Sequence, residues 1–187
     1  MERKSLKQSF SRAKVRKMQE NKMQQIRVEK VTLNIGVGQA GEELKKAEEI
    51  LRRITNSKPV QTICKVKQPT WGIREGLPIG AKVTLRGAKA MEFLKNALNA
   101  KDRQLKASSF DSLGNFGFGV KEYIDLSGVK YDPKLGMKVF DVLVTLEKPG
   151  YRVKKRKKQK RKIPKKHLIR KEEAIEFLKQ AFGVEVQ

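Results

Sequence analysis

One glycine-rich segment of the sequence has the spacing of a nucleotide-binding turn. Gly36–Gly41 reads G-x-G-x-x-G between an apolar run and a helical pattern, which is the local context of a dinucleotide-binding fingerprint. That fingerprint also needs an acidic residue about 20 positions further on to hold the ribose, and Cys64–Lys67 offers two lysines instead. Two other interpretations are a tight turn with positive φ and a set of backbone N–H groups that bind an RNA phosphate. We favour the phosphate, with Gly36 and Gly38 as candidate residues.

Few residues of this chain could perform catalysis. The sequence has one histidine, His167, and one cysteine, Cys64, so most metal sites and general-base arrangements lack their residues. Acidic pairs such as Glu42 and Glu43 fall in helical patterns and are expected to be solvated. We therefore expect no enzyme activity, no cofactor and no metal. The start of the chain has no apolar segment typical of a secretory signal, and no run approaches the ~20 apolar residues of a membrane span, so we expect a cytoplasmic protein with no membrane partner.

Lysine and arginine dominate the chemistry of the sequence. The 187 residues include 44 Lys and Arg against 20 Asp and Glu, a formal net charge of +24, which indicates a polyanionic partner. In Arg152–Lys166, 11 of 15 positions are basic and none is acidic, so this block repels itself. A solvated tail, a localisation signal or a basic membrane-surface helix would be alternatives, although 154–162 has no apolar face for a membrane.

We favour a tail that becomes ordered only when RNA phosphates neutralise it. Its candidate rRNA-binding residues are Arg152, Lys154, Lys155, Arg156, Lys157, Lys158, Lys160, Arg161, Lys162, Lys165 and Lys166.

Apolar periodicity predicts the elements that would position these groups. Residues 79–86 alternate cleanly, which predicts a half-buried strand whose open face carries Lys82, Thr84 and Arg86. The strand predicted over 26–35 has a one-residue slip at Glu29 and Lys30, which indicates a bulge. Further strands are predicted over 60–66 and 139–146, a strand or hairpin is predicted over 115–126, and helices are predicted after Glu42, after Gly87 and over 171–182.

This order of elements fits either a parallel α/β sheet or an α+β layer. The polar alternate face of 79–86 favours α+β, because parallel strands are usually apolar on both faces. We divide the chain into a basic N-terminal extension, 1–24, an α+β RNA-binding domain, 25–150, and a basic C-terminal extension with a short amphipathic helix, 151–187.

Aromatic residues in two segments allow more than one role. Gly114–Val120 resembles the aromatic strand of an RNA-recognition motif but lacks its leading base and its last aromatic residue. We favour core packing of Phe116 and Phe118 over stacking on bases. Trp71 lies in the predicted Pro- and Gly-rich loop 67–78, where packing anchor and exposed contact are equally open.

Five segments, in order, resemble one family. They are Lys30–Gly38, Gly76–Gly87, Phe110–Phe116, Val129–Pro133 and Lys171–Ala174. Together they resemble the large-subunit ribosomal protein L5 family over about residues 20–187. Pro149–Arg152 and the basic extension after it are similar to the archaeal and eukaryotic branch.

The resemblance implies an antiparallel sheet with helices on one side, in the central protuberance of the large ribosomal subunit. The open sheet face and neighbouring loops of the family bind 5S rRNA, and the implied contacts include large-subunit rRNA, other central-protuberance proteins, the peptidyl-site tRNA and the small-subunit protein S13.

By position, the implied 5S rRNA-binding residues include Asn34 and Thr84. The segment that reads G-Q-K-P in many members is Asn56–Pro59 here, so Ser57, with its shorter side chain, and Lys58 take that contact. The loop implied to approach the tRNA is 67–76. Its candidate contact residues are Lys67, Trp71 and Arg74.

Two other classes of function stay open at this point. A cofactor-binding enzyme built on Gly36–Gly41 would bind a nicotinamide cofactor saturably. A general nucleic-acid chaperone or chromatin-like protein would bind duplex DNA and 5S rRNA equally well.

Overall fold

A five-stranded antiparallel sheet is the centre of the molecule. The computed structural model describes residues 21–126, 129 and 131–187. The strands lie in the order β2-β3-β1-β6-β5, and every neighbouring pair is antiparallel. Their bounds are β1 Arg27–Gly36, β2 Val60–Ile63, β3 Pro78–Leu85, β5 Phe116–Val120 and β6 Phe140–Glu147. A short parallel pair, β4 (Gln104–Leu105) with β7 (Glu185–Val186), lies apart from this sheet.

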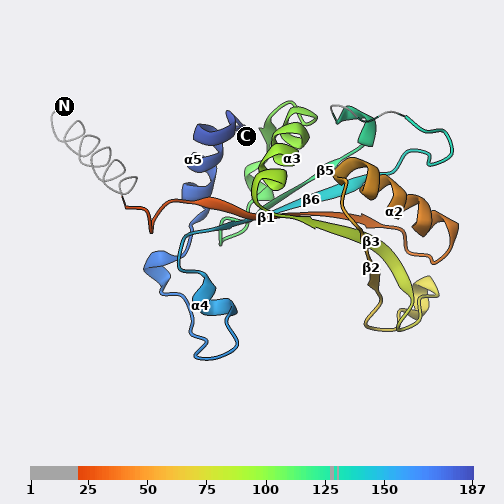
Figure 1. Cartoon of the computed structure of the whole chain (residues 1–187), viewed down its shortest axis with the longest axis horizontal. Helices are drawn as coiled ribbons and strands as arrows, with labels where there is room; N and C mark the ends of the chain where they lie inside the picture. Colours follow the sequence, from red (N-terminus) through yellow and green to blue (C-terminus); the bar gives the residue numbers. More distant parts are fainter. Residues whose placement is uncertain (1–20, 127–128, 130) are drawn as a thin grey trace.

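The longer helices cover one face of the sheet. Figure 1 shows α2 (Glu42–Thr55), α3 (Gly87–Asn99) and α5 (Lys171–Phe182) above the edge-on sheet. The short helix α4 (Arg152–Lys155) and the loop between β2 and β3 project below it, at opposite ends. The arrangement confirms the predicted α+β fold, with a mostly antiparallel sheet and helices packed on one face.

Buried and partly exposed residues alternate along the strands, so one face of the sheet is buried. Val31, Leu33 and Ile35 of β1 point into the core, whereas the residues between them are only partly covered. The apolar stripe of α3 is buried and consists of Ala90, Phe93, Leu94, Ala97 and Leu98. Burial of these apolar side chains against the sheet contributes most of the stability of such a layer.

The C-terminal helix belongs to the same core. Ala174 and Leu178 of α5 are fully buried, and Ile169 before it is also buried. At the end of β6, buried Lys148 donates a 2.6 Å hydrogen bond to Glu173 of α5, which fastens the helix to the sheet. The predicted division into 1–24, 25–150 and 151–187 stays a prediction, and residues 1–20 lie outside the described residues.

Two predicted strands are shorter than the sequence indicated. β2 ends at Ile63 rather than 66, because its register with β3 shifts after Thr62 and the chain turns into the loop. Cys64 is buried there, and its thiol donates to the carbonyl of Val66. In the segment 115–126 only Phe116–Val120 is strand, and a 3-10 turn follows.

Other expectations are confirmed in detail. The predicted bulge lies between Val28 and Lys30, where β1 slips against β6. Phe116 and Phe118 are buried, and Phe116 stacks on Phe110 at a centroid distance of 5.3 Å, so they are core residues.

The glycine-rich turn is not a dinucleotide site. A Rossmann-type fingerprint needs two neighbouring parallel strands, whereas β1 pairs antiparallel with β3 and β6, and β2 pairs only with β3. Gly38 adopts φ 79° in the turn. The N–H groups of Val37 and Gly38 both donate to the carbonyl of Ile79, at 2.9 and 2.8 Å. The enzyme alternative therefore loses the structural unit that it requires.

Candidate nucleic-acid interface

The open face of the sheet brings three predicted RNA-binding residues together. Lys82 of β3 lies directly opposite Asn34 of β1, and Thr84 lies opposite Thr32 one step along the ladder. Lys82 and Thr84 are exposed, and Asn34 is partly exposed. Paired residues on one face of a sheet lie about 5 Å apart, so these side chains form one continuous polar surface.

The same face continues across β6 and β5 with residues that the sequence analysis did not identify. Asp141 lies opposite Asn34, and Leu143 lies opposite Thr32, both exposed. On β5, Gly119 lies opposite Asp141 and Gly117 opposite Leu143. We call this surface the platform. It comprises Thr32, Asn34, Gly36, Gly80, Lys82, Thr84, Asp141, Leu143, Gly117 and Gly119.

Glycines leave part of the platform without side chains. Gly36 lies opposite Gly80, and a Cβ at Gly80 would lie 2.7 Å from the carbonyl oxygen of Ile35. A Cβ at Gly36 would meet no atom within 4 Å, so the surface above it is open. At these glycines no side chain protrudes, so a nucleic-acid backbone can approach the sheet closely there.

Gly36 and Gly38 differ in their positions relative to the platform. Gly36 ends β1 on the platform and is exposed, whereas Gly38 lies in the turn beyond it with its N–H already bonded to Ile79. The structure therefore brings Gly36, and not Gly38, to Asn34.

Ser57 and Lys58 lie outside the platform, at the end of α2. The helix ends at Asn56 in a left-handed conformation, and Ser57 donates from its hydroxyl to the carbonyl of Thr55 at 3.1 Å. Beside them is an open hollow of about 600 Å³. Its charged lining consists of Lys45, Glu48, Glu49, Arg52 and Lys58. The hollow is formed by α2 and by the turn that follows it, just before β2 begins.

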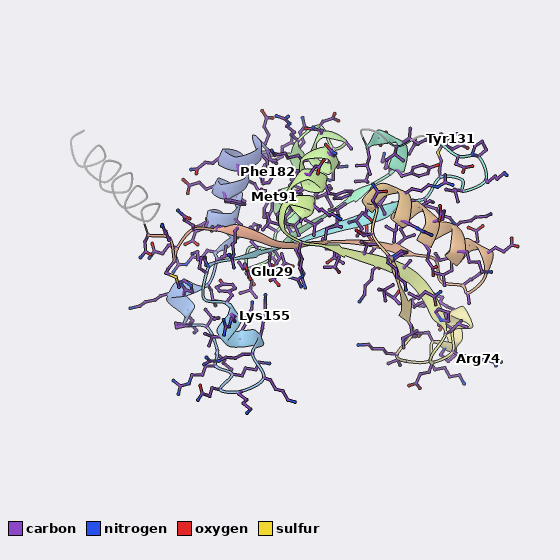
Figure 2. The ribbon with its side chains drawn as sticks, in the orientation of Figure 1. Glu29, Arg74, Met91, Tyr131, Lys155 and Phe182 are labelled. Atoms are coloured by element: carbon purple, nitrogen blue, oxygen red, sulfur yellow. The ribbon has the colours of Figure 1, made fainter. Side chains whose placement is uncertain are left out.

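The loop between β2 and β3 presents its three predicted contact residues to solvent. Lys67, Trp71 and Arg74 are exposed, and Trp71 retains 74% of its accessible surface. Ile73 is buried. The backbone N–H of each of Ile73 and Gln68 donates to the carbonyl of the other, which closes the tip. Figure 2 shows Arg74 at this tip, below the sheet. The structure decides the open question of Trp71 in favour of an exposed side chain rather than a packing anchor.

The basic segment after β6 follows a defined path. Tyr151 is buried, and its hydroxyl donates to the carbonyl of His167 and accepts the N–H of Ile169. Lys154 lies 4.6 Å from the centroid of the Tyr151 ring. Of the eleven predicted tail cations, all except Lys154 are exposed residues.

One expectation about this segment was wrong. Phosphates are not the only groups that can neutralise its charge, because the ammonium of Lys155 forms ion pairs with Glu29 and Glu147 of the sheet. Glu29 lies far from Lys155 in the sequence. A local sequence pattern around Lys155 therefore could not have predicted both of its ion pairs.

The described residues offer little support for other kinds of site. Among them, no three His, Cys, Asp or Glu side chains are grouped to hold a metal ion. Likewise, none of the helices in the described part of the chain has the length and apolar character needed to cross a bilayer.

Comparisons with known proteins all match the chain to one ribosomal protein family. The model of the family described as "Ribosomal protein L5" matches residues 21–74, and the model of the C-terminal region of the same ribosomal family matches residues 78–177. The large ribosomal subunit protein uL5 of Methanococcus vannielii is 52% identical over 167 residues, which cover 88% of this chain and 92% of that protein. The corresponding proteins of Sulfurisphaera tokodaii and Nanoarchaeum equitans are also 52% identical, over 89% of this chain and over 94% and 99% of their own lengths.

Proposed function

The chain belongs to the ribosomal protein L5 family, and we propose that it binds 5S rRNA through the open face of its sheet. Membership makes the protein a structural, non-enzymatic constituent of the large ribosomal subunit, with rRNA as its general partner, and it works in the cytoplasm. The finer assignment to 5S rRNA rests on the platform and on the cations at its two ends.

The platform carries the proposal because its chemistry suits RNA. Asn34 donates and accepts hydrogen bonds, Thr84 offers a hydroxyl, and Lys82 offers a cation, all on neighbouring strands. Proteins recognise RNA largely by shape and by contacts to 2′-hydroxyls and phosphates across a shallow groove. A low, polar surface with glycines at its edges can lie against such a groove.

Cations flank the platform on two sides. Lys67 and Arg74 project from the β2–β3 loop, and the 152–166 segment projects at the other end of the sheet. Within the platform, the positive charge of Lys82 is offset by the negative charge of Asp141. The attraction for phosphates therefore comes mainly from the loop and the basic segment on either side. This division fits the general rule that phosphate contacts position a protein whereas other contacts specify the sequence. We assign the basic segment to large-subunit rRNA beside the 5S rRNA.

We assign the peptidyl-site tRNA contact to the tip of the β2–β3 loop. Trp71 provides a flat aromatic surface for a nucleotide, and Lys67 and Arg74 provide cations for its backbone. Protein contacts need a different surface. Tyr131, Met137 and Val139 expose apolar area in the loop before β6, and we assign the contact with the small-subunit protein S13 to them.

Direct binding tests the proposal. The full chain should bind 5S rRNA more tightly than duplex DNA of equal length at the same salt concentration, in filter binding across several salt concentrations. Equal affinity for the two would contradict the proposal and would support a general nucleic-acid chaperone.

A further inference from the structure

Five charged side chains meet below one end of the sheet. Glu29 of the β1 bulge accepts a 3.3 Å hydrogen bond from Arg86, and it is also ion-paired with Lys155 of α4. Glu147, at the end of β6, accepts from Lys155 at 3.2 Å and from Arg27 at 2.7 Å. Lys155 thus bridges two carboxylates on adjacent strands, and Figure 2 shows it just below Glu29.

These two carboxylates are unusual for a surface that faces RNA. The Glu29 side chain is only 6% exposed and that of Glu147 is 12% exposed. Burial raises the pKa of Glu29, but hydrogen bonds from Lys155 and Arg86 outweigh it and hold the pKa below its ordinary value. Glu29 is therefore charged at neutral pH. A buried negative charge repels phosphates, so its presence on this face requires a compensating benefit.

The bulge explains how Glu29 reaches its position. β1 pairs Val28 with Leu146 and Lys30 with Thr145, so Glu29 is an extra residue with no partner in the ladder. A bulge of this kind re-aims a side chain that regular alternation would place elsewhere. Here it brings the carboxylate beside Arg86 and α4.

The benefit is the position of α4. This helix has four residues, far too few to be stable alone. Tyr151 anchors its start in the core, and Lys155 anchors its end to the two carboxylates. The chain then closes back on it, since the N–H of Arg161 donates to the carbonyl of Val153. The orientation of α4 therefore decides where the cations of 156–162 project.

We propose that Glu29 and Glu147 are positioning residues for RNA binding, two acidic side chains that raise the affinity of the protein for rRNA by holding its basic segment in place. The inference rests on the proposed rRNA contact of that segment. Pre-ordering a segment removes the entropy cost of ordering it in the complex, which is the general source of affinity gained by pre-organisation. Lys155 is then an internal counter-ion, whereas Arg152 and Arg156 remain for phosphates.

The inference makes a prediction opposite in sign to simple electrostatics. Glu29→Gln adds one unit of net positive charge, so charge counting alone predicts tighter RNA binding. We expect instead that binding of the full chain to protein-free large-subunit rRNA becomes about tenfold weaker. The slope of log K against log salt should fall by about 0.7–0.9 for each phosphate that the protein no longer binds.

Glu43→Gln is the matched control. Glu43 is also ion-paired with two lysines, Lys46 and Lys138, but it lies on α2, on the other face of the sheet. This variant has the same net charge as Glu29→Gln and should bind rRNA as tightly as the unchanged protein or slightly more tightly. Binding of Glu29→Gln that equals or exceeds that of Glu43→Gln would overturn the inference.

Hydrogen exchange separates this inference from the function on which it rests. Without RNA, the amides of 153–156 should exchange at least tenfold faster in Glu29→Gln, with the amides of β1 and β6 unchanged; unchanged exchange in α4 would overturn the inference. If the unchanged protein failed to bind rRNA at all, the proposed function would fail, whatever the exchange result.

A second pair of variants covers the case in which Glu29→Gln does not fold. Lys155→Arg keeps the cation and should retain rRNA affinity and α4 protection. Lys155→Met should lose both. Equal rRNA binding by the two Lys155 variants would contradict the positioning role.

Discussion

The tip of the β2–β3 loop should serve translation rather than assembly, and the double variant Trp71→Ala with Arg74→Ala tests this. A tryptophan side chain offers up to about 250 Å², and Trp71 keeps 74% of its surface exposed. About a quarter of that area, ~60 Å², is buried, which at ~25 cal/mol per Å² gives at most about 1.5 kcal/mol. The buried area of Trp71 is therefore small, and global stability and 5S rRNA affinity should stay nearly unchanged.

The effect should appear on the ribosome. Stacking of one base on an aromatic side chain contributes about 1–3 kcal/mol, so peptidyl-site tRNA should dissociate from variant ribosomes about fivefold faster or more. Ile73→Ala is the packing control, because Ile73 is buried in the same loop and its truncation should lower stability without removing a nucleotide contact. Reduced 5S rRNA binding by the double variant, together with normal tRNA retention, would refute the reasoning.

The remaining predictions concern charge and packing. Neutralising three lysines in 157–162 should lower the slope of log K against log salt by roughly 0.7–0.9 for each phosphate released, for any RNA sequence, as measured by filter binding. Since the pKa of Glu29 is lowered in the folded state, its contribution to stability is present above its ordinary value of 4.5 and is lost as pH falls through the lowered pKa. Urea unfolding should therefore show a difference between the unchanged protein and Glu29→Gln that shrinks with acidification. Gly114→Ala should lower the thermal midpoint, because Gly114 has φ 75° and a Cβ there would lie 2.6 Å from Cγ2 of Ile169.

The periodicity of apolar residues in the sequence predicted the elements that have one solvent-exposed face and one buried face. The alternation of 79–86 placed Lys82 and Thr84 on the open face correctly, since a strand side chain must point either to the core or to solvent. Arg86 is exposed but follows the end of β3, where it precedes α3. Periodicity overextended β2, because Val60, Ile63 and Val66 are apolar yet exposed at the edge of the sheet and in the loop. Residue type alone does not show where pairing ends.

The rest of the candidate site depends on contacts between distant segments. Asp141 and Leu143 join the platform only because β6 pairs with β1, and strand register is not encoded in either strand by itself. The ion pairs of Lys155 with Glu29 and Glu147 could not be predicted from the charge run, because they depend on how that run lies against the sheet. The 74% exposure of Trp71 also needed the structure, since a loop tryptophan can pack or protrude.

The central claim is that 5S rRNA binds the platform, and the double variant Asn34→Ala with Thr84→Ala tests it most directly. Both side chains lie on the open face of the central strands β1 and β3, away from the core, so the circular dichroism spectrum should not change. Loss of one or two hydrogen bonds with partners left unpaired should weaken 5S rRNA binding by about 1–3 kcal/mol. Undiminished binding of 5S rRNA by a folded double variant would show that the platform is not the 5S rRNA surface.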